Sequence, residues 1–104
     1  MRKMTAMTDR GTVLDKLRAD ETTLKGEFAV RSLALFGSGA GDDAGRARDI
    51  DLLVEFDRPV GLLHFSRTAR HLSDVLGAPV DLIARRAILP ELRDDILSQA
   101  VDVF

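Results

Sequence analysis

The segment LALFGSGAGDDAGRARDIDLLVEF, Leu33 to Phe56, decides the fold. A short apolar run stops at a glycine and a serine, a glycine-rich loop follows, and two aspartates, Asp49 and Asp51, head a second apolar run. Residues 31–36 predict a first β-strand. Residues 49–56 predict a second, because their side chains alternate with the period of two that is typical of strands. One face of it would carry Ile50, Leu52, Val54 and Phe56, and the other Asp49, Asp51, Leu53 and Glu55.

The flanking sequence alternates between helical and extended patterns. Apolar residues at helical spacing predict a helix over residues 9–25, ended by Gly26, and a second over residues 62–76, ended by Gly77. Residues 79–84 predict a third strand. Pro90 suits the first turn of a last helix. With a loop or short helix between the first two strands, this order predicts an α/β fold: a small mixed β-sheet covered by helices. The apolar stripes of the last two helices are Leu62, Phe65, Ala69, Leu72, Leu76, and Leu92, Ile96, Leu97, Ala100.

Length and composition limit the class of protein. The 104 residues fit one domain, predicted at 8–104 after a disordered lead-in at 1–7. A net charge of −2 gives no case for binding nucleic acid. The absence of cysteine excludes disulfides and thiolate metal sites and fits a cytoplasmic protein. No apolar run approaches the roughly 18 residues of a membrane span.

The two aspartates at the head of the second strand point to a metal. Asp49 and Asp51 are two strand positions apart, so both project from one face about 6–7 Å from each other. Such carboxylates repel each other unless a cation neutralises them. Taken alone, this spacing is more often a solvated start of a strand. Mg²⁺, however, is usually held by one or two carboxylates together with substrate phosphates.

The turn after the first strand supplies the complementary half of such a site. Gly37 lets backbone N–H groups approach an anion, and Ser38 adds a hydroxyl donor. A pair of metal-binding carboxylates that faces a phosphate-binding turn is suited to nucleotide chemistry.

These residues carry a resemblance to a known family. Gly37-Ser38, ten intervening residues and Asp49-Ile50-Asp51 resemble the GSx₁₀DxD signature of the DNA-polymerase-β-like nucleotidyltransferases. The length and surrounding sequence resemble the minimal nucleotidyltransferases, from about residue 31 to 100. In that family a third carboxylate lies on a neighbouring strand, and Asp81 in APVDLIA is the matching position.

The resemblance implies a role for each of these positions. Asp49 and Asp51 would hold two Mg²⁺ ions on the triphosphate of ATP, and Asp81 would complete the metal site on the acceptor side. Gly37 and Ser38 would contact the β- and γ-phosphates. An acceptor hydroxyl would then attack the α-phosphate and release pyrophosphate.

The resemblance also implies a partner. Many minimal nucleotidyltransferases act as antitoxins of HEPN-domain ribonuclease toxins, and some resemble AMP transferases that modify a toxin tyrosine, as in a type VII system. One departure lies in residues 39–42. Typical members read close to G-S-x-A-R-G, whereas Gly41 and Asp42 stand here in place of the arginine and the glycine. Arg46 or Arg48 would have to supply the missing cation to the nucleotide.

Two other functions stay open at this point. The chain could neutralise a toxin by binding alone, with a weakened active site. It could instead modify a small molecule such as an aminoglycoside, although such enzymes carry an added acceptor domain. Nothing in the sequence decides whether the chain forms oligomers.

The remaining polar residues favour structural roles. His64 and His71 are seven residues apart, not at the four-residue spacing that chelates a metal, and are predicted on a solvated face with Arg67 and Arg70. Glu55 is predicted at the rim of the site or in a salt bridge. The pair Arg85-Arg86 is predicted in a solvated turn.

Overall fold

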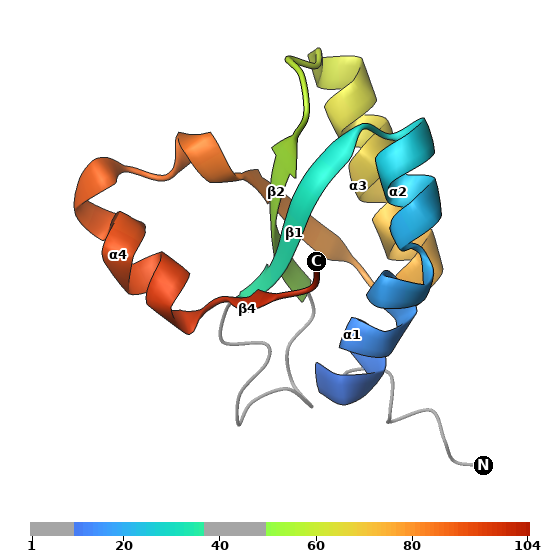
Figure 1. The fold of residues 1–104 in the computed structure, drawn as a ribbon, viewed down its shortest axis with the longest axis horizontal. Coiled ribbons are helices and arrows are strands. Elements are labelled where there is room, and N and C mark those ends of the chain that lie inside the picture. Colours follow the sequence, from blue (N-terminus) through green and yellow to red (C-terminus); the bar gives the residue numbers. More distant parts are fainter. Residues whose placement is uncertain (1–9, 37–49) are drawn as a thin grey trace.

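The computed structural model describes residues 10–36 and 50–104, which form a four-stranded sheet between two unequal helical layers (Figure 1). The predicted lead-in at 1–7 and the segment that holds Asp49 lie outside the described residues. The elements in chain order are α1 (Arg10–Ala19), α2 (Glu21–Glu27), β1 (Val30–Phe36), β2 (Ile50–Phe56), α3 (Leu62–Leu76), β3 (Val80–Ala84), the 3₁₀ helix η3 (Arg85–Ala87), α4 (Pro90–Gln99) and β4 (Val101–Asp102).

The sheet is mixed, as predicted. Its strand order is β3-β2-β1-β4. β1 pairs antiparallel with β2 and with β4, whereas β2 pairs parallel with β3. The parallel pair is joined by α3, which crosses from the end of β2 back to the start of β3, as parallel neighbours require. The third predicted strand therefore lies beside the second, at the edge of the sheet.

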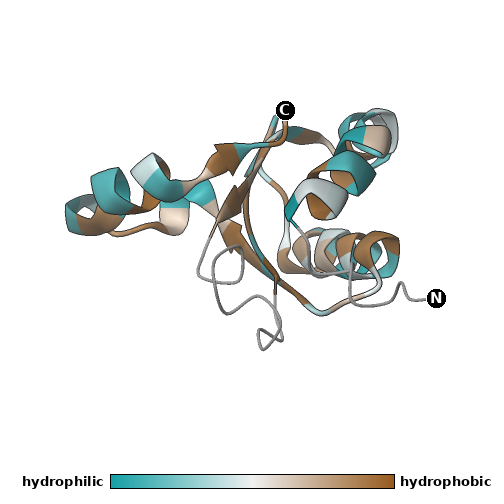
Figure 2. Cartoon of the chain, turned by 90° about the horizontal axis from the view of Figure 1, so that it is seen from below, coloured by the Kyte–Doolittle hydropathy of each residue, from teal (hydrophilic) through white to brown (hydrophobic). Residues whose placement is uncertain are grey.

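The alternation along β2 separates two cores. Leu52 and Val54 face a large cluster that includes Leu72 and Leu76 of α3, and α1 and α2 add Leu17 and Leu24. The alternate side chain, that of Leu53, faces a small cluster on the opposite side of the sheet. Its members are Ala34, Leu53, Ile88 and, partly buried, Phe36, Ile83, Ile96, Leu97 and Ala100. Figure 2 shows the two unequal layers, with α4 on the side of the small cluster and the larger helical layer on the other side.

The N-terminal helix is interrupted, which corrects the single helix predicted over residues 9–25. The chain turns at Asp20, whose N–H donates to the carbonyl of Leu17 over 3.1 Å, and α2 starts at the next residue. Gly26 lies inside α2 and does not end it. The turn is tied to α3, because the Asp20 carboxylate accepts a hydrogen bond from the His71 ring over 2.6 Å.

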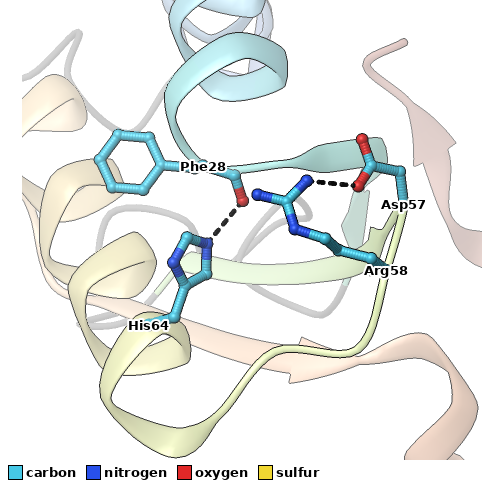
Figure 3. A network of polar contacts seen from close by, with 4 residues as sticks. All are labelled: Phe28, Asp57, Arg58 and His64. Atoms are coloured by element: carbon cyan, nitrogen blue, oxygen red, sulfur yellow. Dashed lines mark hydrogen bonds and ion pairs between the residues drawn. The ribbon is translucent and has the colours of Figure 1, made fainter.

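The two histidines of α3 are half-buried, so the prediction that they lie on a solvated face is wrong. The ring of His71 stacks on that of Phe28, with centroids 4.6 Å apart. The ring N–H of His64 donates to the Phe28 carbonyl over 2.7 Å (Figure 3). Both histidines therefore hold the end of α2 against α3.

The predicted bounds of the helix over residues 62–76 and the predicted start of the last helix at Pro90 hold, although parts of both apolar stripes do not: Ala100 follows the end of α4 in an extended conformation. α3 ends at Gly77, which adopts a left-handed conformation with φ of 69°. α4 starts at Pro90. Leu62, however, is 81% exposed and Leu92 is 45% exposed. The first turns of both helices therefore leave apolar side chains on the surface.

One strand was not predicted from the sequence. β4 pairs with β1 through Ala34 and Leu35. Arg18 of α1 donates to the carbonyls of Asp102 and Val103 over 3.2 and 3.1 Å, which holds the C-terminal segment in place. Among the described residues, no helix is long and apolar enough to cross a membrane.

Candidate active site

Asp51 and Asp81 lie side by side on the sheet. They are register partners on the parallel strands β2 and β3, and each is the second residue of its strand. Register partners on neighbouring strands are about 4.8 Å apart and point to the same face. That face also carries Leu53 and Ile83, the register pair two positions further along, which belongs to the small core cluster. The two carboxylates therefore lie on the α4 side of the sheet, at the end where β2 and β3 begin.

The two carboxylates differ in exposure. Asp51 is half-buried and Asp81 is exposed, whereas Leu52 and Leu82, the next register pair, are buried. The site thus lies where the core ends and solvent begins. Asp81 is open to solvent, while the backbone of Asp51 is held between β1 and β3.

Five of the predicted site residues lie outside the described residues. They are Gly37, Ser38, Arg46, Arg48 and Asp49. The ends of the segment that contains them are described. Phe36, the residue before Gly37, is the register partner of Asp51, and Ile50, the residue after Asp49, starts the strand that carries Asp51. The chain therefore leaves β1 and enters β2 next to the carboxylate pair.

The donor set suits a hard divalent cation. Two carboxylates on one face, one of them open to solvent, match the one or two carboxylates with which proteins hold Mg²⁺ beside substrate phosphates and water. Within residues 10–36 and 50–104, no group of three or more histidine, cysteine, aspartate or glutamate residues is placed to hold a metal. The roles of Asp51, Asp81 and Asp49 as ligands stay a prediction.

The other polar residues considered from the sequence lie away from this pair. The Glu55 side chain is exposed and accepts a hydrogen bond from the Ser32 hydroxyl over 3.2 Å. Arg85 follows Asp81 by four positions, about 13 Å along β3, and belongs to η3 at the opposite end of the strand. Arg86, beside it, is exposed. This geometry favours a role for both arginines away from the carboxylates.

Comparison with known proteins identifies the class. The model of the nucleotidyltransferase domain family matches residues 16–103, and the chain belongs to that family. Within it, the protein adenylyltransferase MntA of Thermococcus cleftensis is 31% identical over 87 residues, which cover 84% of this chain and 88% of MntA. A Methanocaldococcus jannaschii protein, provisionally named a protein adenylyltransferase, is also similar to this chain. It is 42% identical over 78 residues, which cover 75% of this chain and 84% of the relative.

Solved structures agree with this class. A structure provisionally described as a minimal nucleotidyltransferase is 32% identical and superposes with a TM-score of 0.68 over 89% of this chain and 94% of that chain. The chain is thus a nucleotidyltransferase of the minimal, MntA-like type. A complex of a tri-AMPylated Shewanella oneidensis HEPN toxin with its MNT antitoxin shares the fold, with a TM-score of 0.62 at 19% identity over 88% of this chain and 71% of that chain.

Proposed function

We propose that this chain transfers AMP from ATP to a tyrosine hydroxyl of a HEPN-type toxin, in a Mg²⁺-dependent reaction, and so acts as the antitoxin of that protein. The observation that carries the proposal is the register pairing of Asp51 with Asp81, which sets two carboxylates on one face beside the end of β1. The names of the MntA relatives support adenylyl transfer to a protein. Neighbours described as toxin-antitoxin complexes, one of them with AMP-PNP, support the nucleotide and the partner.

Each site residue has a proposed task. Asp49, Asp51 and Asp81 would hold two Mg²⁺ ions. When bound, the ions neutralise the triphosphate and stabilise charge on the attacking and leaving oxygens. Gly37 and Ser38 would orient the β- and γ-phosphates.

The chemical step breaks the phosphoanhydride bond between the α- and β-phosphates of ATP and forms a phosphodiester between the tyrosine oxygen and AMP. The tyrosine oxygen forms a bond to the α-phosphorus as the bond from that phosphorus to the β-phosphate oxygen breaks, and pyrophosphate leaves. The hydroxyl proton is lost in the same step. Asp81 would assist this loss; its exposure to solvent, greater than that of Asp51, supports this task for an acceptor that arrives from outside. Arg46 or Arg48 would supply positive charge to the phosphates.

A second candidate function has the same toxin partner but involves no transfer of AMP. Gly41 and Asp42 stand where family members commonly have an arginine and a glycine, which removes a cation and adds a carboxylate near the phosphates. On this alternative, the chain neutralises its toxin by binding alone.

Label transfer separates the two candidates. The chain is incubated with Mg²⁺, ATP labelled at the α-phosphate and the HEPN-type toxin encoded in the same genome, and the products are separated on a denaturing gel. We expect label on the toxin, and none with Asp51→Asn or without Mg²⁺. The variant Asp15→Asn, at an exposed position of α1, is the control that should retain transfer. A toxin that is bound and inhibited but never labelled would favour the second candidate.

A further inference from the structure

A cavity opens at the end of the sheet opposite to the carboxylate pair. Its volume is about 670 Å³, and it lies between the ends of β2 and β3, the start of α3, η3 and α4. Along β2, five positions, about 17 Å, separate Asp51 from Phe56 at the cavity. The cavity is therefore a separate site from the predicted centre of transfer.

The floor of the cavity is apolar. Val54 and Phe56 line it from β2, Phe65 from α3 and Leu97 from α4. Leu62 stands at its edge with 81% of its surface exposed, and Leu63 beside it is 76% exposed. The apolar surface thus continues out of the cavity and over the first turn of α3.

Positive charge dominates the rim. Four arginines and two carboxylates line the cavity, in a chain whose net charge is −2. The two carboxylates already have partners: Asp57 pairs with Arg58 over 3.2 Å (Figure 3), and Glu55 accepts a hydrogen bond from Ser32. The other three arginines form no ion pair with any residue that the structure describes. They are Arg85, Arg86 and Arg93.

We propose that this cavity is a docking site for a segment of a partner protein that combines acidic with large apolar side chains. Charge complementarity favours acidic side chains in the partner, since three arginines without an ion-pair partner among the described residues line the cavity. The apolar floor favours large apolar side chains in the partner. The exposed Leu62 and Leu63 extend this apolar surface beyond the cavity, where a small molecule bound inside would leave it uncovered. Large apolar anchors inside a charged rim are the usual arrangement of a protein interface.

Peptides selected from a random library test this inference, because such a selection does not require the partner to be identified. A phage-displayed library is selected against the whole chain, and enriched sequences are synthesised with a fluorescent label for anisotropy titrations. We expect enriched peptides to combine Asp or Glu with Leu or Phe. Their affinity should fall at least about tenfold for the double variant Arg86→Glu/Arg93→Glu, and should weaken as salt is raised.

Matched variants make the test specific to the cavity. Arg67→Glu/Arg70→Glu reverses the same number of charges at exposed positions of α3 that do not line the cavity, and should leave affinity within about twofold. Leu62→Ser removes the apolar edge without touching the core and should weaken binding. Circular dichroism melting curves confirm that each variant is folded.

Three results would overturn the inference. The first is the absence of any enriched peptide, and the second is enrichment of peptides without acidic residues. The third is an equal loss of affinity in the cavity variant and in its α3 control, which would assign the effect to net charge. Because the assay uses neither ATP nor a toxin, its outcome is separate from that of the proposed transfer.

Discussion

The variant Asp81→Asn should be more stable than wild type in the metal-free protein. It should be less stable than wild type once Mg²⁺ and ATP are bound. The prediction follows from the parallel register of β2 and β3, which holds Asp51 and Asp81 as neighbours on one face. Two carboxylates so placed repel each other when no cation lies between them. Asparagine has nearly the same shape and removes one of the two charges.

The size of the effect can be worked from the strand spacing. Neighbouring strands lie about 4.8 Å apart, and two unit charges about 5 Å apart in water repel by about 0.8 kcal/mol. The value for water applies because Asp81 is exposed. A gain of about 0.8 kcal/mol raises the melting temperature of a domain of this size by about 5 °C. In about 1 M NaCl, where the screening length is about 3 Å, most of the gain should disappear.

The addition of Mg²⁺ and ATP should reverse the order. A ligand at about one hundred times its dissociation constant stabilises the folded state by about 2.7 kcal/mol. Wild type should gain this stabilisation in full, and Asp81→Asn only part of it, since one anionic ligand is lost. The variant should therefore melt above wild type in EDTA and below it with Mg²⁺ and ATP.

Differential scanning fluorimetry, in a buffer with EDTA and in a buffer with Mg²⁺ and ATP, measures both melting temperatures directly. Asp15→Asn, an exposed substitution on α1, is the control and should respond to Mg²⁺ and ATP as wild type does. If Asp81→Asn melts below wild type in EDTA, or gains as much from Mg²⁺ and ATP, then Asp51 and Asp81 do not share a cation and the reasoning fails.

Three further substitutions test the packing that positions the site. Leu72→Ala should lower the free energy of unfolding by about 3–4 kcal/mol, measured by urea denaturation, because Leu72 is fully buried in the large core cluster. Gly77→Ala should cost about 1 kcal/mol in the same assay, because φ at this position is 69° and alanine is strained there. Thr68→Val should change stability by less than about 1 kcal/mol, because the hydroxyl donates only to the His64 carbonyl of its own helix, which keeps its backbone partner. A loss above about 2 kcal/mol there would show that this hydroxyl has a larger role.

The patterns that predicted the fold were local ones. Alternation along residues 50–56 predicted both faces of β2 correctly, because a strand that is covered on both sides still separates its side chains with a period of two. Gly77 ended α3 as predicted, since a left-handed residue after a helix is most easily glycine.

The features that were missed depend on contacts between distant residues. At the break, the Asp20 carboxylate is hydrogen-bonded to the ring of His71, 51 residues along the chain, and the helical pattern on either side gives no sign of this contact. β4 is two residues long, too short for any periodicity, and exists because it pairs with β1 and is bound by Arg18.

Part of the site could be predicted and part could not. The sequence indicated that Asp81 lies on a strand near Asp51, but only the register shows that the two are direct neighbours. The cavity at the other end of the sheet has no sequence signature. Its arginines, Arg58, Arg85, Arg86 and Arg93, come from a loop, η3 and α4, and the fold brings them together.

The most direct test of the central claim is the intact mass of the toxin after incubation with this chain, ATP and Mg²⁺, measured beside the toxin's ribonuclease activity. The account predicts that the toxin gains the mass of one or more AMP units as its activity disappears, and that neither change occurs with Asp51→Asn or Asp81→Asn. A toxin that loses its activity at unchanged mass, with wild type and both variants alike, would contradict it.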